Sequence, residues 1–174
     1  MKKSIIYLMS VCFLVFILSA FSSKSDSVYD HGPLKIGDYA PNFILEGSDG
    51  KTYQLSDFKG KIVVLDFWAM WCAPCKKKMP KIQKLHETYS DMGVAVLGML
   101  AMNKGAEEKA KTYFAENEYS FKLLYGNDEL TKNYELKFLP TVVVVDKEGK
   151  IVYLTTKPNP NEFEDITAIV EKYK

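Results

Sequence analysis

The chain has 174 residues, of which 47% are apolar and 26% charged, and 23 basic residues against 22 acidic ones leave a net charge of +1. This composition is typical of a globular protein, so wholesale disorder, collagen-like repeats and coiled coils are excluded. All the basic residues are lysine, and a charge-balanced chain without arginine's planar guanidinium is a poor partner for nucleic acid. Three cysteines are too few for a disulfide-stapled scaffold.

The N-terminus has the pattern of an export segment. Lys2 and Lys3 precede an apolar run over residues 5–21, and small residues follow it. This order is typical of a signal peptide, but the run is also just long enough to span a bilayer, so cleavage and anchoring both stay open. The two lysines would remain cytoplasmic, which places the rest of the chain in the periplasm or at the outer face of the cytoplasmic membrane. The predicted organisation is a signal peptide or membrane anchor, a polar tether and one domain, over residues 1–22, 23–33 and 34–174.

Strand and helix signals alternate along the rest of the chain. Two short strands flank a Ser-Asp-Gly turn, which predicts a hairpin over residues 42–55. Continuous apolar runs predict strands buried on both faces, and apolar residues at helical spacing predict helices. Strands are expected at residues 62–68, 94–100, 121–125, 141–146 and 150–155, and helices at 75–90, 106–117 and 161–173. This order predicts an α/β fold with a mixed central sheet flanked by helices.

The motif Cys72-Ala73-Pro74-Cys75 follows a predicted buried strand and opens a predicted helix. The amide groups and dipole of the helix N-terminus stabilise a thiolate at Cys72, and the thiolate is the attacking species in disulfide exchange. Cys75, one turn later, is placed to attack a mixed disulfide on Cys72 and release the partner. The sequence therefore predicts Cys72 as nucleophile and Cys75 as resolving cysteine of a redox-active disulfide.

Other interpretations of this motif need residues that the chain does not offer. A structural zinc site takes four ligands, whereas the exported part has two cysteines, His31 and His86. Covalent haem attachment would need a histidine at position 76, which is Lys76. We therefore predict no metal and no cofactor. A purely structural disulfide stays as an alternative.

Asp66 is a carboxylate within an apolar strand, six residues before Cys72. Burial should raise its pKa, and it could then accept a proton from Cys75 during exchange. The alternative is a structural group that is satisfied by hydrogen bonds.

Two further segments are expected near the cysteines. Trp71 adjoins the motif and is predicted to pack at the rim of the site. Leu139-Pro140-Thr141 directly precedes a buried strand, and because cis bonds are infrequent the pattern alone predicts a trans peptide bond before Pro140.

These residues resemble the thioredoxin superfamily. Residues 71–76 (WCAPCK) are similar to the thioredoxin active-site motif, Asp66 falls where thioredoxins have a buried aspartate, and residues 134–141 resemble the segment with their cis-proline. The resemblance implies a thioredoxin fold and a cis bond before Pro140. It also implies a surface that binds the substrate strand, formed by Trp71, Leu139, Pro140 and Thr141.

A narrower branch fits better. Residues 37–43, 49–51, 55–61 and 67–69 resemble the TlpA-like, AhpC/TSA-related branch of exported, often membrane-anchored disulfide reductases. That branch inserts a helix and a strand into the thioredoxin fold, which would correspond here to residues 106–125.

The sequence departs from the branch at three positions. Lys78 replaces an acidic residue and completes a run with Lys76 and Lys77, which either favours the Cys72 thiolate or forms a solvated basic face. Asp66 replaces an asparagine, and no lysine occurs in residues 94–100 to pair with it. Phe138 replaces a small residue, which would narrow the substrate groove.

The resemblance implies a thiol–disulfide oxidoreductase that mainly reduces protein disulfides, with apocytochrome c the best-known substrate of the branch. Electrons would come from a membrane thiol transporter, and we expect a monomer. Two alternatives stay open, namely an oxidant or isomerase, and a non-catalytic binding module on a thioredoxin scaffold. Peroxidase activity is not expected, because Ala69 stands where a peroxidatic Cys72 would need threonine.

Overall fold

The computed structural model describes residues 33–155 and 159–174. The predicted export segment, residues 1–22, and the predicted tether as far as residue 32 lie outside the described residues. Within the described part of the chain, no helix is both long and apolar enough to cross a membrane.

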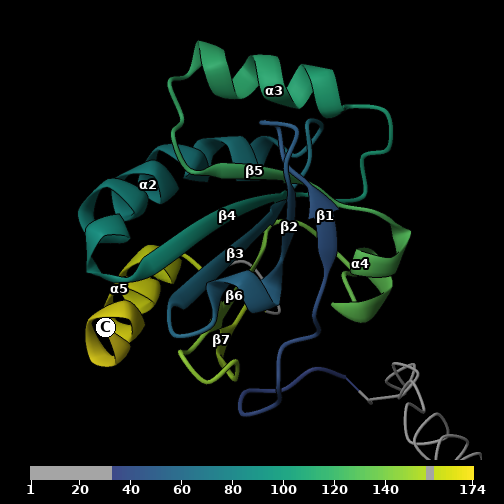
Figure 1. Cartoon of the computed structure of the whole chain (residues 1–174). Coiled ribbons are helices and arrows are strands. Elements are labelled where there is room, and N and C mark those ends of the chain that lie inside the picture. The colour runs from purple at the N-terminus through teal and green to yellow at the C-terminus, as the bar shows by residue number, and fades with distance from the viewer. Residues whose placement is uncertain (1–32, 156–158) are drawn as a thin grey trace, which may run out of the picture. The chain divides into compact units, whose positions relative to one another are not determined.

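A five-stranded mixed sheet forms the centre of the domain, with strand order β5-β4-β3-β6-β7 (Figure 1). Strands β3, β4 and β5 are parallel, β6 runs antiparallel to β3, and β7 runs antiparallel to β6 and so in the same direction as the first three. The strands are β3 (Ile62–Trp68), β4 (Val94–Leu100), β5 (Lys122–Tyr125), β6 (Thr141–Val145) and β7 (Ile151–Leu154). A separate antiparallel hairpin precedes them, β1 (Ile44–Glu46) and β2 (Thr52–Gln54). The predicted α/β fold, mixed sheet and N-terminal hairpin are therefore confirmed.

Helices cover both faces of this sheet. The predicted helices are present as α2 (Ala73–Tyr89), α3 (Glu107–Glu116) and α5 (Glu162–Tyr173). Three short elements were not predicted, η1 (Leu55–Phe58), η2 (Ser90–Met92) and α4 (Asp128–Asn133). They are too short to show a helical period. The start of α4 is fixed by Asn127, whose side chain accepts a hydrogen bond from the amide of Leu130 at 2.8 Å.

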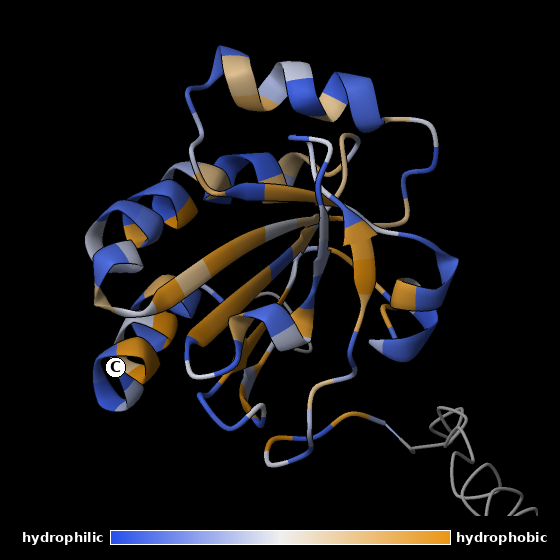
Figure 2. Ribbon diagram, viewed as in Figure 1, coloured by the Kyte–Doolittle hydropathy of each residue, from blue (hydrophilic) through white to orange (hydrophobic). Residues whose placement is uncertain are grey.

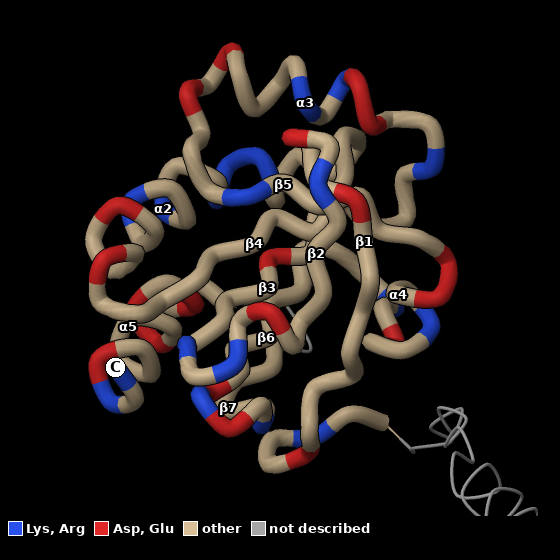
Figure 3. The backbone as a smooth tube through the Cα atoms, viewed as in Figure 1, with Lys and Arg blue, Asp and Glu red and all other residues tan. Residues whose placement is uncertain are grey.

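The alternation of β3 divides the core in two. Ile62, Val64 and Trp68 pack against α2, α3 and α5, whereas Val63, Leu65 and Phe67 pack against the hairpin, η1 and α4. Figure 2 shows the apolar strands at the centre, and Figure 3 shows the charged residues mainly on helices and loops. Side chains two apart on a strand share a face, so Asp66 points toward α2 and α5.

The predicted insertion, residues 106–125, is present as α3 and β5. Its aromatic residues anchor it over the end of β3: the ring of Phe114 lies 5.5 Å from that of Trp68 and 4.9 Å from that of Phe121. A Cβ at Gly98 on β4 would come within 2.9 Å of the Phe121 ring, so glycine lets these rings lie directly on the sheet. The insertion therefore packs close to the loop that carries the cysteines.

Candidate active site

Cys72 and Cys75 form a disulfide at the N-terminus of α2. Cys72 is the N-cap residue, and the amide of Cys75 donates a hydrogen bond to Cys72 Sγ at 3.2 Å. Pro74 lies in the first turn, where no amide donor is required. Both cysteines are buried, Cys75 completely. After reduction, the same amide and the helix dipole are available to stabilise a thiolate at Cys72.

The loop before Cys72 is held by the loop that follows β4. The amide of Met70 donates to Asn103 Oδ1 at 2.6 Å, and the indole N–H of Trp71 donates to the carbonyl of Met102 at 3.2 Å. Met102 has a left-handed backbone with φ of 53°, which is uncommon outside glycine. Trp71 is nevertheless 60% exposed, so its ring lies at the surface beside the disulfide. The sequence analysis missed Met102 and Asn103, because an asparagine in a loop carries no signal of its own.

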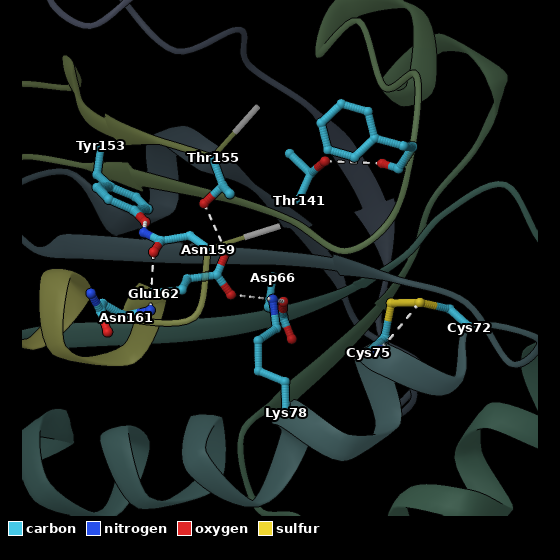
Figure 4. Close-up of polar contacts among 11 residues, drawn as sticks. Asp66, Cys72, Cys75, Lys78, Thr141, Tyr153, Thr155, Asn159, Asn161 and Glu162 are labelled. Atoms are coloured by element: carbon cyan, nitrogen blue, oxygen red, sulfur yellow. Dashed lines mark hydrogen bonds and ion pairs between the residues drawn. A yellow bond between two sulfur atoms is a disulfide. The ribbon is translucent and has the colours of Figure 1, made fainter. Parts of the chain in front are cut away.

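The segment around Pro140 lies at the same edge of the sheet. Thr141, the first residue of β6, is paired with Phe67 near the end of β3 that leads to Cys72. The Leu139–Pro140 peptide bond is cis. The hydroxyl of Thr141 donates to the carbonyl of Phe138 at 2.9 Å and is therefore used within the loop (Figure 4). Leu139 and Pro140 are half-buried, so part of each can contact a substrate.

Three charged side chains meet behind the disulfide. The amine of Lys78 lies 2.7 Å from Asp66 Oδ1 and 3.0 Å from Glu162 Oε2 (Figure 4). The hydroxyl of Thr155 donates to the other oxygen of Glu162 at 2.8 Å. The side chain of Asp66 is fully buried, and those of Lys78 and Glu162 are only 13% and 9% exposed. We call these residues, Asp66, Lys78 and Glu162, the buried charge cluster.

The cluster corrects the interpretation of Lys78. The prediction of a solvated basic face is wrong for Lys78, because its amine points into the core and pairs with two carboxylates. Lys77 is exposed, and the amine of Lys76 lies 5.0 Å from the centre of the Tyr113 ring. Strand β4 contains no lysine that could pair with Asp66. Lys78 on α2 pairs with it instead.

Burial and pairing act in opposite directions on these groups. Burial raises the pKa of Asp66 above its ordinary value, although Lys78 opposes the shift. Burial by itself would lower the pKa of Lys78, but the carboxylates of Asp66 and Glu162 outweigh it and raise that pKa. Asp66 is therefore a carboxylate that holds a proton more readily than a solvent-exposed one.

Comparison with known proteins places the chain in a family. The sequence matches the Redoxin family over residues 35–170. The chain belongs to the Redoxin family. Within that family it is 35% identical to the thiol-disulfide oxidoreductase ResA of Bacillus thuringiensis subsp. konkukian, over 68% of each chain. It is 30% identical to ResA of Geobacillus thermodenitrificans, over 100% of this chain and 99% of that one.

Solved structures agree with this Redoxin assignment. A thiol:disulfide interchange protein from Bacteroides sp. matches with a TM-score of 0.69 and 27% identity, over 79% of this chain and 91% of that one. The thioredoxin domain of a thiol-disulfide oxidoreductase from Bacteroides vulgatus matches with a TM-score of 0.68 and 25% identity, over 79% and 99%. The thioredoxin fold and the TlpA-like resemblance are confirmed.

As a Redoxin family member with a Cys72–Cys75 disulfide, the protein is a thiol–disulfide oxidoreductase. The residues described here include no group of three or more histidine, cysteine, aspartate or glutamate side chains that could hold a metal ion. Besides Met102 and Asn103, the sequence analysis missed Glu162. The only signal for Glu162 was its place in the first turn of the C-terminal helix, where acidic residues are common on any helix.

Proposed function

We propose that the protein is an exported reductant of protein disulfides, and that Cys72, Cys75 and Asp66 carry its reaction. The single observation that supports the chemistry most directly is the Cys72–Cys75 pair at the N-terminus of α2, with Cys75 buried behind Cys72.

The reaction would take two exchange steps. The Cys72 thiolate attacks one sulfur of a substrate disulfide, which forms a mixed disulfide and releases the other sulfur as a thiolate. Cys75 then loses its proton to Asp66 and attacks Cys72 Sγ. This second attack closes the Cys72–Cys75 disulfide and releases the remaining substrate sulfur as a thiolate. The substrate gains two electrons, and the enzyme loses two.

The charge behind the cysteines favours the reducing direction. A pair becomes a strong oxidant when its reduced form is stabilised, above all by a low-pKa thiolate. Here Lys78 is occupied by two carboxylates, so the cluster has a net charge of −1 when Asp66 and Glu162 are both ionised. Negative charge nearby disfavours the Cys72 thiolate, and this favours donation of electrons.

The reduction potential of the Cys72–Cys75 pair tests the direction. Reference values are about −270 mV for thioredoxin and about −120 mV for a strong oxidant. Equilibration with glutathione or dithiothreitol buffers should give a value near the thioredoxin end. A value near the oxidant end would contradict the proposed direction and favour an oxidant or isomerase.

Cysteine variants test the two steps. Cys72→Ser should lose reduction of a disulfide substrate completely, because the other described cysteine, Cys75, is fully buried and cannot make the first attack. Cys75→Ser should instead accumulate mixed disulfides on Cys72. Residual turnover by the first variant would contradict Cys72 as the nucleophile, and no trapped partner with the second would contradict Cys75 as the resolving cysteine. Loss of both cysteines without any phenotype would favour a binding module.

The proposed surface for the substrate strand is formed by Trp71, Leu139, Pro140 and Thr141. Support comes from the exposed ring of Trp71 and from the position of residues 139–141 at the edge of the sheet that carries the disulfide. Trp71→Ala should raise KM for a disulfide-bonded peptide several-fold while the reduction potential stays the same.

Export and electron supply rest on residues 1–22 and on the branch that the chain resembles. We propose a monomer in the periplasm or at the outer face of the membrane, reduced by a membrane thiol transporter, with apocytochrome c cysteines among its substrates. Alkylation of intact cells should find Cys72 and Cys75 reduced only when the transporter is present. A chain beginning at residue 23 should stay in the cytoplasm, and N-terminal sequencing of the exported protein distinguishes a cleaved signal from an anchor.

A further inference from the structure

Glu162 is a buried carboxylate on α5, and the exchange mechanism above does not use it. One of its oxygens accepts from Thr155 at 2.8 Å, and the other pairs with Lys78 at 3.0 Å. It also lies in the first turn of α5, where the helix dipole favours negative charge. Three independent interactions therefore hold the carboxylate of Glu162 in one place.

Asp66 is in the opposite situation. It is fully buried, and apart from Lys78 no donor in the part of the chain that the structure describes reaches either of its oxygens. Its only cation is thus shared with a second carboxylate that is better supported. The negative charge of Glu162 offsets part of the stabilisation that Lys78 gives to ionised Asp66. It also repels ionised Asp66 directly, and both effects raise the pKa of Asp66.

We propose that Glu162 is a positioning residue for the exchange reaction: it holds Lys78 between two carboxylates and so keeps Asp66 ready to accept the Cys75 proton. The inference rests on the proposed role of Asp66. Without Glu162, Lys78 would pair with Asp66 alone, and Asp66 would become a weaker base.

The groups that face Asp66 come from two helices. Its neighbours on the adjoining strands are Gly98 on β4 and Val142 on β6, and neither of these strands carries an ionisable side chain. Helix α2 contributes Lys78 and, under the proposed mechanism, the thiol of Cys75, three residues earlier on the same helix.

Helix α5 contributes Glu162, and its remaining charged side chains are exposed. Two carboxylates and one amine therefore set the charge around the proton that Cys75 gives up.

In the resolving step the S–H bond of Cys75 breaks and an O–H bond forms on Asp66. The electron pair left on Cys75 Sγ forms the new bond to Cys72 Sγ, and the substrate leaves as a thiolate. Below its own pKa, Asp66 already holds a proton and cannot take another. The rate of resolution should therefore fall as the pH drops below the pKa of Asp66.

Stopped-flow reaction of the reduced protein with dithiobisnitrobenzoate isolates this step. The first release of thionitrobenzoate reports attack by Cys72, and the second reports resolution by Cys75. We call the fall in the rate of the second phase at low pH its acid limb. For Glu162→Gln, this limb should move to lower pH by about one unit, because Lys78 then pairs with Asp66 alone. For Lys78→Gln, the limb should move in the opposite direction, because Asp66 loses its cation.

Two controls make the result specific. Glu164→Gln removes the same charge from the same turn of α5 at an exposed position and should leave the limb where it is. In an Asp66→Asn background, which should remove the limb, Glu162→Gln should produce no shift. Thermal unfolding of each variant confirms that it is folded at the pH values used.

The outcomes separate the inference from the proposed function. If Asp66→Asn removes the acid limb but Glu162→Gln leaves it unmoved, the role of Glu162 is overturned and that of Asp66 stands. If Asp66→Asn leaves the limb intact, Asp66 is not the proton acceptor, and both fail. A Glu162→Gln shift that persists without Asp66 would mean that Glu162 acts on the cysteines directly, which also overturns the inference.

Discussion

The two faces of the central sheet are built from alternate residues of the same strands but carry different chemistry. Beneath α2 and α5, the core contains the disulfide and the buried charge cluster of Asp66, Lys78 and Glu162. Beneath η1 and α4, the core cluster consists of aliphatic and aromatic side chains such as Leu65 and Phe67.

The difference shows where the fold can accommodate charge. The first face buries ionised groups because each finds a partner on a neighbouring helix, whereas the second face is stabilised by apolar packing. Stability of the first face should therefore depend on pH, and that of the second should not.

The largest expected effect on the charged face comes from Lys78→Met. Removing the shared cation leaves two buried carboxylates without a counter-ion, which should cost about 4 kcal/mol of unfolding free energy at neutral pH. The loss should shrink in acid, where Asp66 takes up a proton. Urea unfolding at several pH values measures both quantities, and a loss under 1 kcal/mol would mean that the cluster is well solvated.

Leu130→Ala is the matched change on the apolar face. Leu130 is buried on α4, and truncation should cost about 3 kcal/mol through lost burial and the cavity that remains. The loss should be the same at every pH where the protein is folded, and the reduction potential should not change. A pH-dependent loss here would break the contrast between the two faces.

Asp66→Asn should reveal the pH dependence of the charged face most directly. The folded protein binds a proton at Asp66 more tightly than the unfolded chain does, so acid favours the folded state. The contribution is complete below the ordinary aspartate pKa of about 4 and is lost as the pH rises through the raised pKa. The unfolding free energy of the wild type minus that of Asp66→Asn should therefore fall with rising pH over this window. A difference that rises with pH would show that Lys78 lowers the pKa more than burial raises it.

Asn103→Ala should give the smallest effect. It removes the acceptor for the partly buried amide of Met70 and should cost about 1–2 kcal/mol. Because that bond holds the loop before Cys72, the rate of attack by Cys72 should also fall several-fold. Thr112→Ala is a control, since its hydroxyl donates only to the carbonyl of Glu108 on the exposed side of α3 and its loss should leave the attack rate unchanged.

The sequence predicted the local features well. The long apolar strands β3 and β4 were predicted with their observed ends, because continuous apolar runs need no tertiary information to be recognised. Short elements such as α4 were missed, since six residues show no period. The pattern around Pro140 predicted a trans bond, and only the resemblance to thioredoxins predicted the cis bond that the structure contains.

In the candidate site, too, the local motif was predictable from the sequence and the contacts between distant elements were not. The spacing of Cys72 and Cys75 at a strand-to-helix junction was sufficient to predict the redox pair, because the chemistry depends on residues one helical turn apart. The partners of Asp66 were not predictable, because Lys78 and Glu162 lie on two helices far apart in the chain.

The sequence by itself determined the α/β class, the cysteine pair and a carboxylate within an apolar strand. The tertiary structure decided that α2 and α5 meet over that carboxylate, and hence that Lys78 is a buried, shared cation and not a solvated one. The physical reason is that periodicity shows which side of an element is buried, whereas the charge that a buried group meets depends on how separate elements pack.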